Sequence, residues 1–140
     1  GIGAKNAMRL AINEAGIALE QVDYINTHGT STPIGDVAEV KAIQDVFGEH
    51  AYHISLTSSK SMTGHILGGT GAVEAIISIL SMQHGVVTPT INHEEGDEDP
   101  NIDYKLNFTF NQAQQRDIRY AMSNNFGFGG HNACLLFKKL

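Results

Sequence analysis

The segment that most limits how this chain can fold is an apolar stretch from Thr70 to Gln83. Its apolar residues lie on nearly every side of a helix rather than along one stripe: Ala72, Val73, Ala75, Ile76, Ile77, Ile79, Leu80 and Met82. A helix that is apolar all round is stable only when neighbouring layers cover it, so we expect it in the middle of the molecule. Glu74 falls inside this stretch, where a charge is costly unless it is paired.

Helical and extended patterns alternate along the rest of the chain. Apolar residues at helical spacing predict helices at 4–15 and 37–47, which end at Gly16 and Gly48. The predicted extended segments, short and bounded by turn residues, are 22–26, 53–57, 86–91, 118–123 and 133–137. This alternation is typical of a layered α/β fold.

Charge and hydropathy exclude several classes of protein. The net charge is −6, and no basic run is longer than Lys138-Lys139, so no nucleic-acid partner is expected. The longest apolar run, 75–80, is broken by Ser78 and is far shorter than the roughly 20 residues of a membrane span, so no membrane association is expected. The single cysteine, Cys134, excludes an internal disulfide and favours the reducing cytosol.

Three connections that follow predicted strands contain most of the unusual residues. They span 28–36 ("HGTSTPIGD"), 60–65 ("KSMTGH") and 126–132 ("FGFGGHN"). Polar glycine-rich connections at strand ends often carry functional side chains. These three loops are therefore the candidates for a site.

The histidines of the first two loops, together with a lysine, suggest one kind of chemistry. His28 and His65 each follow a predicted strand, and Lys60 lies close to His65 in sequence. Two neutral imidazoles can each donate an N–H to one developing oxyanion, and a nearby ammonium can fix charge or tautomer. The set can stabilise an enolate, but it lacks a nucleophile.

Glycine-rich nucleotide-binding motifs do not account for the stretch at 64–74. A phosphate-binding loop needs a lysine where Thr70 stands. The dinucleotide pattern fails as well, because Gly69-Thr70-Gly71 is followed by Val73 and Glu74 rather than by the third small residue.

A metal site and a cysteine nucleophile are also not expected. The other histidines considered as ligands have no ligand spacing and read as surface or loop residues: His50, His53, His84 and His93. Cys134 lies in the apolar run "ACLLF", which gives it a core neighbourhood and a structural role.

Three long motifs in this order resemble one enzyme family. "HGTSTPIGD", "SSKSMTGHILGGTGAVEA" and "SNNFGFGGHN" are similar to the C-terminal part of beta-ketoacyl-acyl-carrier-protein synthases, in particular of the synthase II type with a Cys-His-His site. The resemblance runs over practically all 140 residues. It implies decarboxylative condensation of an acyl thioester with malonyl-acyl-carrier protein in fatty acid elongation.

The resemblance also implies a fold and a domain organisation. Members have a thiolase-like fold with α-β-α-β-α layers, in which two similar halves each form a mixed sheet flanked by helices. They are much longer than this chain, so residues 1–140 are expected to be an incomplete C-terminal domain. The N-terminal half, with the nucleophilic cysteine, would be absent, and a fragment alone would be inactive.

Roles for the polar set follow from the matching positions. His28 and His65 resemble the pair that binds the malonyl thioester carbonyl and stabilises the enolate, and Lys60 resembles the lysine that organises them. Glu74 resembles the buried glutamate behind that lysine, and a structural role and a supporting role at the site both remain open for it.

Binding and gating roles are implied for the two outer loops. Thr30 and Thr32 resemble threonines that contact the pantetheine arm of the carrier, although capping of their own loop is an open alternative. Phe128 resembles the gating phenylalanine whose N–H contributes to an oxyanion hole, and Gly127 and Gly129 would permit its motion.

Two neighbours of Phe128 are interpreted differently. Phe126 reads as packing support. His131 stands where many members have threonine, so it is a departure that could change loop polarity or acyl preference rather than a third histidine of the site.

No cofactor or metal is expected for this chemistry. The implied partners are acyl- and malonyl-loaded acyl carrier protein, and the intact enzyme is expected to be a cytoplasmic homodimer. The alternatives are a non-catalytic chain-length-factor-like subunit, against which His28, His65 and Lys60 argue, and a thiolase or Cys-His-Asn synthase, whose asparagine motif is not seen here.

Overall fold

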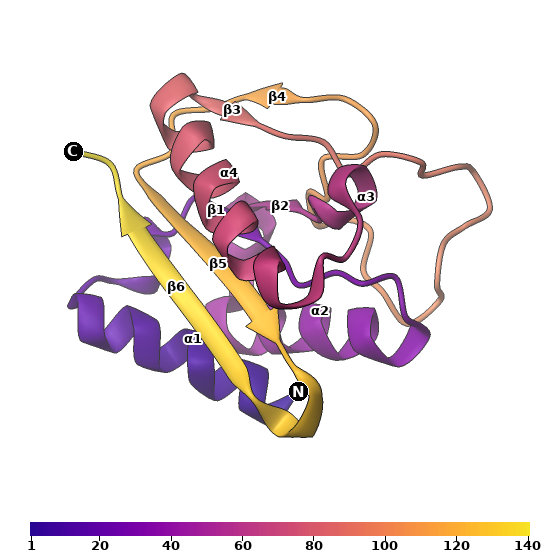
Figure 1. Cartoon of the computed structure of the whole chain (residues 1–140), viewed down its shortest axis with the longest axis horizontal. Helices are drawn as coiled ribbons and strands as arrows, with labels where there is room; N and C mark the ends of the chain where they lie inside the picture. Colours follow the sequence, from indigo (N-terminus) through magenta and orange to yellow (C-terminus); the bar gives the residue numbers. More distant parts are fainter.

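A computed structural model describes all 140 residues and contains one four-stranded sheet in the order β2-β1-β5-β6 (Figure 1). The strands are β1 (Tyr24–Asn26), β2 (Ser55–Thr57), β5 (Tyr120–Phe126) and β6 (Asn132–Lys138). β1 pairs in parallel with β2 and β5, and β6 is antiparallel to β5. The sheet is therefore mixed, and three of its strands end at the same edge.

Helices cover both faces of this sheet (Figure 1). Helices α1 (Ile2–Ala15) and α2 (Pro33–Phe47) pack side by side on one face, and α4 (Thr70–His84) lies on the other, against β5. The larger core, which includes Met8, Ile43 and Met122, lies between α1, α2 and the sheet. A smaller one joins Tyr24 and Met82 on the side of α4. The α/β layering expected from the alternating pattern is confirmed.

Short elements complete the fold. They are the helix α3 (Lys60–Thr63), the two-stranded ladder of β3 (Val86–Val87) with β4 (Gln114–Gln115), and 3₁₀ helices at Leu19–Gln21, Gly48–His53, Leu67–Gly69 and Phe128–Gly130. No helix of the structure combines the length and the apolar character that a membrane crossing requires.

Several predicted element bounds are wrong. Residues 28–36 are not a loop throughout, because α2 already begins at Pro33, whose missing N–H costs nothing at the first helical position. Residues 60–63 form a helical turn inside the predicted loop. The strand predicted from 53 begins at Ser55, since the preceding residues are held in a 3₁₀ helix.

The C-terminal hairpin is longer than predicted. The pairing of β5 with β6 extends to Phe126 and Asn132, so only 127–131 connect the strands instead of nine residues. The polar pair Asn124-Asn125 belongs to the ladder, where it pairs with Cys134 and Ala133. Asparagine is uncommon in strands, so the sequence pattern predicted a loop at these two positions.

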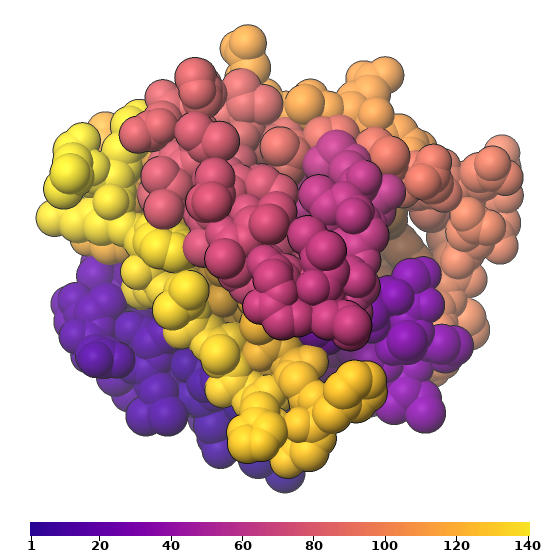
Figure 2. Space-filling model, in the orientation of Figure 1, coloured from indigo at the N-terminus to yellow at the C-terminus, as the bar shows by residue number.

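The prediction that α4 is buried all round is wrong for this chain. The face of α4 that packs on the sheet is largely polar, with Thr70, Glu74 and Ser78 almost fully buried and Met82 as its apolar contact. Other apolar residues turn outward, where Ile76 is 57% and Leu80 is 46% exposed, and Figure 2 shows the helix uncovered on this face. No other element of the chain packs over these side chains, so the helix has a covering layer on one side only.

Candidate active site

The site is built where the parallel strands end. β1 leads through Thr27 to His28, β2 leads to Lys60 at the start of α3, and β5 leads to the turn at Gly127. Since parallel strands present their carboxyl ends at one edge of a sheet, the three predicted loops lie together. His65 reaches the same edge from the connection between α3 and α4.

The structure brings the two predicted histidines together. The rings of His28 and His65 stand 5.7 Å apart between centroids and perpendicular to each other. Phe126 packs against His28 at 5.6 Å, which is the supporting contact expected for it. Residues 37 apart in the chain therefore form one pair of rings at the sheet edge.

Backbone hydrogen bonds favour the same tautomer in both rings. Nδ1 of His28 accepts the N–H of Phe126 at 3.4 Å, and Nδ1 of His65 accepts the N–H of Leu67 at 3.2 Å. The hydroxyl of Thr70 lies 3.1 Å from the same Nδ1 of His65. A neutral imidazole whose Nδ1 is an acceptor carries its proton on Nε2, so each ring has an Nε2–H that is free to donate.

The environment keeps His28 uncharged. Burial, followed by the charges of the Lys60 ammonium and of His65, lowers the pKa of His28 to about 4. Loss of solvation and a nearby positive charge both disfavour the imidazolium. His28 is therefore a neutral hydrogen-bond donor at physiological pH.

We expect the titration of the His28 ring to be measurable directly. NMR spectra of the chain with ¹³C-labelled histidine should show one ring signal with a midpoint near pH 4, assigned by its disappearance in His28→Gln. The depressed pKa means that this group stabilises the fold above its unfolded value of 6.5, and that the stabilisation is lost as the pH falls through about 4. A midpoint at or above 6.5 would contradict this account.

Lys60 and Glu74 form a buried ion pair behind the histidines. The Lys60 ammonium contacts Oε1 of Glu74 and donates to Oε2 at 3.1 Å, and both side chains are almost wholly inaccessible. Burial raises the pKa of Glu74, while the hydrogen bond and charge of Lys60 oppose the shift. The carboxylate on α4 thus has the partner that its position requires.

The phenylalanine of the third loop stays outside this cluster. The side chain of Phe128 is 94% exposed, and Gly129 beside it has a φ of 76°, which glycine adopts without strain. The N–H of Gly127 donates to the carbonyl of His131 at 2.6 Å and closes the turn. His131 is exposed beside Gly129 and makes no contact with the histidine pair.

The two threonines lie between His28 and α2. Their hydroxyls are 3.3 Å apart, and both side chains are accessible. Thr32 precedes α2 but makes no side-chain cap bond to the helix, while the contact between the two hydroxyls lies within their own loop. Thr30 and Thr32 present hydroxyls at the surface close to His28.

The other histidines and Cys134 have structural surroundings. His50 bonds through Nε2 to the carbonyl of Val22 at 2.9 Å, and His93 stacks on Phe110 at 3.8 Å. No group of three or more histidine, cysteine or acidic side chains could hold a metal ion. Burial, and then the charge of Glu39, raise the pKa of Cys134 to about 12, so this thiol is not a nucleophile.

Glu39 was not among the predicted site residues, but it touches the His28 loop directly. Its carboxylate accepts the backbone N–H groups of His28 and Gly29 at 2.8 and 2.9 Å. A signal was present, because Glu39 lies four and seven residues before the buried Ile43 and Val46 and so places a charge on the buried stripe of its helix.

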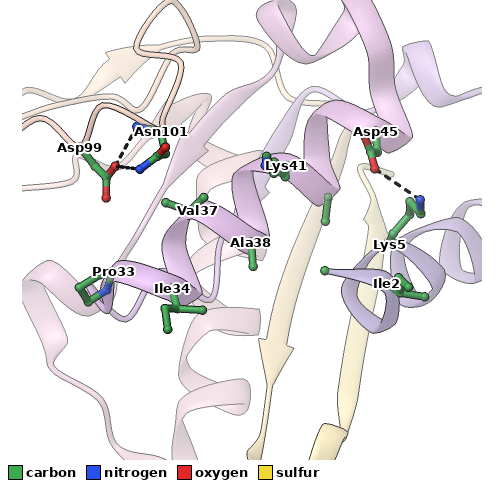
Figure 3. Close-up of a pocket in the computed structure, with 12 residues that line it drawn as sticks. Ile2, Lys5, Pro33, Ile34, Val37, Ala38, Lys41, Asp45, Asp99 and Asn101 are labelled. Atoms are coloured by element: carbon green, nitrogen blue, oxygen red, sulfur yellow. Dashed lines mark hydrogen bonds and ion pairs between the residues drawn. The ribbon is translucent and has the colours of Figure 1, made fainter.

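One hollow on the surface lies away from this site. It measures about 580 Å³ and runs along α1 and α2, lined by Ile34, Val37 and Lys41 among others, with Lys5 paired to Asp45 at its end (Figure 3). A second cavity of about 320 Å³ lies beneath the His28 loop and is bordered by Lys60 and Glu39. Only the second adjoins the polar cluster.

Comparisons with known proteins agree on one family. Residues 1–94 match the domain family described as beta-ketoacyl synthase, C-terminal domain. The chain is 54% identical over 139 residues to 3-oxoacyl-[acyl-carrier-protein] synthase 2 of Staphylococcus aureus (strain COL), which covers 99% of this chain and 33% of that protein. The chain thus spans about a third of the length of the curated relative.

Solved structures with the same architecture are also synthases. A beta-ketoacyl synthase from Burkholderia phymatum STM815 superposes with a TM-score of 0.89 at 39% identity, covering 98% of this chain and 32% of that one. A chain from the structure of a type II polyketide acyl-carrier protein in complex with its ketosynthase superposes with a TM-score of 0.91 at 33% identity. The match covers 99% of this chain and 33% of that one. The thiolase-like fold class expected from the motifs is confirmed by these matches.

Proposed function

Because this chain belongs to the beta-ketoacyl synthase family, we propose that it is the C-terminal part of a 3-oxoacyl-[acyl-carrier-protein] synthase and supplies the groups that stabilise the enolate. The observation that carries the proposal is the pairing of His28 with His65, whose rings are 5.7 Å apart. Backbone N–H groups occupy both Nδ1 atoms, so both Nε2–H groups are available for one oxygen.

The proposed reaction follows from these donors. When the malonyl thioester loses carbon dioxide, the electron pair of the broken C–C bond moves to the thioester oxygen and forms an enolate. Two N–H donors on that oxygen stabilise the charge more in the transition state than in the ground state. The enolate carbon then attacks an enzyme-bound acyl thioester, forms the new C–C bond and releases the cysteine thiolate.

Lys60 supports this step as a fixed positive charge. Its ammonium is held by Glu74 and contributes to the lowered pKa of His28. The neutral ring of His28 would donate its Nε2–H to the oxygen as a hydrogen bond and remain unprotonated at Nδ1. Glu74 acts through Lys60, since its carboxylate oxygens lie in contact with the ammonium.

The nucleophile is proposed to come from another part of the protein. The one thiol here, Cys134, has a pKa of about 12 and is not reactive. The exposed apolar face of α4, with Ile76, Ile79 and Leu80, needs a covering layer. We infer that an N-terminal half bearing the cysteine packs over this face, so that residues 1–140 are an incomplete thiolase-like domain.

Substrate binding is assigned to the two accessible loops. The accessible hydroxyls of Thr30 and Thr32 would contact a pantetheine arm, and the exposed Phe128 would gate the entrance. The phenylalanine N–H would contribute to an oxyanion hole, and Gly127 and Gly129 would permit its movement. The carrier would be an acyl carrier protein, as in the polyketide complex that shares this fold.

The assembly and its location complete the proposal. The whole enzyme would act as a cytoplasmic homodimer, a location in keeping with a chain whose single cysteine forms no disulfide. The chemistry uses side chains and backbone alone, without a metal or cofactor. A non-catalytic chain-length-factor-like subunit is less well supported, because such a subunit has no need of the oriented histidine pair.

We expect the full-length protein to release labelled carbon dioxide from malonyl-acyl-carrier protein and to form a 3-oxoacyl product, and the 140-residue chain alone to do neither, because it lacks a nucleophile. Both proteins are assayed with the same carrier substrates. A full-length protein that neither decarboxylates nor condenses would refute the proposed function. Acyl transfer onto the isolated chain would refute the proposal that the nucleophile lies outside residues 1–140.

A further inference from the structure

We propose that Thr70 is a positioning residue for His65: its buried hydroxyl donates to Nδ1 of the ring and thereby keeps the ring proton on Nε2. This inference rests on the proposed function of His65, because the Nε2–H is the group that would meet the substrate oxygen. Thr70 is the first residue of α4 and is 1% exposed, whereas residues 62–69 before it are all exposed. The connection that carries His65 is therefore anchored where α4 begins.

The hydroxyl of Thr70 serves this connection rather than its own helix. Its oxygen accepts the N–H of Ile66 at 2.9 Å and lies 3.1 Å from Nδ1 of His65. No side chain caps the N-terminus of α4, and the hydroxyl forms no hydrogen bond with the helix backbone. One hydroxyl thus contacts both the imidazole and the peptide that follows it.

The burial of this hydroxyl decides where its proton points. The oxygen already accepts the Ile66 N–H, and Nδ1 of His65 is the one acceptor with which the hydroxyl forms a hydrogen bond. A buried O–H without an acceptor is unfavourable, so the proton points at Nδ1. Because a nitrogen of a neutral imidazole accepts only when it carries no proton, the proton of His65 lies on Nε2.

Thr70 adds to the hydrogen bond that Leu67 supplies at the same atom. The Leu67 N–H donates to Nδ1 at 3.2 Å, from a residue with a φ of 52°, which is an uncommon value for leucine. The two donors share the lone pair of Nδ1 in a three-centre arrangement. A proton on Nδ1 would face the Leu67 N–H and would leave the Thr70 O–H without an acceptor, so every form of the ring with that proton is disfavoured.

The tautomer matters because His28 and His65 would donate to one oxygen from perpendicular rings. A His65 ring with its proton on Nδ1 would present a lone pair to the enolate oxygen instead of an N–H, and the stabilisation would be lost. Removing the partner that fixes the tautomer of a metal-binding histidine typically costs about 10- to 100-fold. We expect the lower end here, because the Leu67 N–H remains.

Three substitutions at Thr70 separate the hydroxyl from the shape of the side chain. Valine keeps the branched shape without the hydroxyl, and serine keeps the hydroxyl on a side chain close in size to that of alanine. In the full-length protein, Thr70→Val and Thr70→Ala should each lower kcat for malonyl-carrier decarboxylation about 10-fold, with KM changed by less than about threefold. Thr70→Ser should stay within about threefold of the wild type. Since two variants lack the hydroxyl, failure of one to fold leaves the other as the test.

Ser78→Ala is the matched control. Ser78 is fully buried on the same face of α4, and its hydroxyl donates to the carbonyl of Glu74 at 2.8 Å. This variant should decarboxylate at the rate of the wild type. A loss that follows side-chain size, with Thr70→Ser as slow as Thr70→Ala, would overturn the proposal, and so would full activity in both variants without the hydroxyl.

A double variant tests whether Thr70 acts through the imidazole. In a His65→Ala background, Thr70→Val should cause no further loss of decarboxylation, because the ring that it positions is absent. A further loss of the same size would show that the hydroxyl acts elsewhere and would contradict the positioning role.

Nitrogen NMR reports the tautomer without any reaction. In the full-length protein with ¹⁵N-labelled histidine, spectra are recorded above the pH at which histidine ordinarily titrates, and the His65 signals are assigned by their disappearance in His65→Ala. The Nδ1 and Nε2 signals should lie far apart in the wild type and in Thr70→Ser, and should move toward each other in Thr70→Val as the second tautomer becomes populated.

This measurement keeps the inference distinct from the proposed function. An unchanged separation of the two signals in Thr70→Val would refute the role of Thr70 even in an active enzyme. An inactive wild type in which Thr70→Val moves the signals as expected would refute the reaction and leave the coupling of Thr70 to the His65 tautomer established.

Discussion

Replacing either His28 or His65 by alanine in the full-length protein should lower the proposed malonyl decarboxylation by about 10²- to 10³-fold, the usual effect of removing one oxyanion donor. The expectation follows from the perpendicular rings and from the Nε2–H that each histidine offers. Loss of one donor leaves the developing enolate with half of its hydrogen bonds from the two histidines. The rate is measured as labelled carbon dioxide released from malonyl-acyl-carrier protein.

The two variants should also reveal that the histidines act as a unit. Removing both should cost less than the product of the single losses, because groups that share one oxygen are not additive. His53→Ala is the matched control, since His53 is exposed in the 3₁₀ helix before β2. A single alanine variant that keeps full decarboxylation activity would exclude that ring from the oxyanion site.

The layering of the fold could be predicted because its helices repeat apolar residues at helical spacing. Helices 4–15 and 37–47 carry a buried stripe that the structure packs on the sheet, as Met8 and Ile43 show. The ends of the strands could be predicted less well from the sequence, because β5 and β6 extend over polar residues whose pairing depends on the opposite strand. β4 left no signal, because two exposed glutamines pair with Val86 and Val87 only through their backbone.

The orientation of α4 could not be derived from its composition. Hydrophobicity placed the helix in the middle of the molecule, but the structure turns Thr70, Glu74 and Ser78 toward the sheet and the larger apolar residues outward. The polar positions repeat at four-residue spacing and form a stripe of their own. Within that stripe Glu74 pairs with Lys60 and Thr70 bonds His65 and the N–H of Ile66, so the buried polar side chains have partners on this side of the helix.

The histidine pair could be predicted because topology is a strong constraint. Once two loops follow strands of one parallel sheet, their side chains meet at one edge whatever the exact strand lengths. Glu39 was harder to recognise, since it lies within a helix and acts on backbone N–H groups that leave no trace in the sequence. The exposed orientation of Phe128 likewise depends on the turn that closes between Gly127 and His131.

Replacement of Lys60 by methionine should destabilise the full-length protein by about 3–5 kcal/mol, because it leaves the buried carboxylate of Glu74 without its partner. Burial already raises the pKa of Glu74, and loss of the ammonium removes the interaction that opposes this shift. The loss is measured as the shift of the urea unfolding midpoint. The matched surface variant Lys5→Met breaks the accessible pair with Asp45 and should cost less than about 1 kcal/mol.

The pH dependence and a double variant distinguish an unpaired charge from a packing defect. A carboxyl whose folded pKa is raised favours the folded state below its unfolded pKa and loses that contribution as the pH rises through the folded value. The deficit of Lys60→Met should therefore be larger near pH 8 than near pH 5. Lys60→Met combined with Glu74→Leu should recover most of the stability, since apolar groups of similar volume can replace a buried pair at little cost. A deficit that is independent of pH and persists in the double variant would mean that packing of the Lys60 side chain, and not its charge, holds α3 against α4.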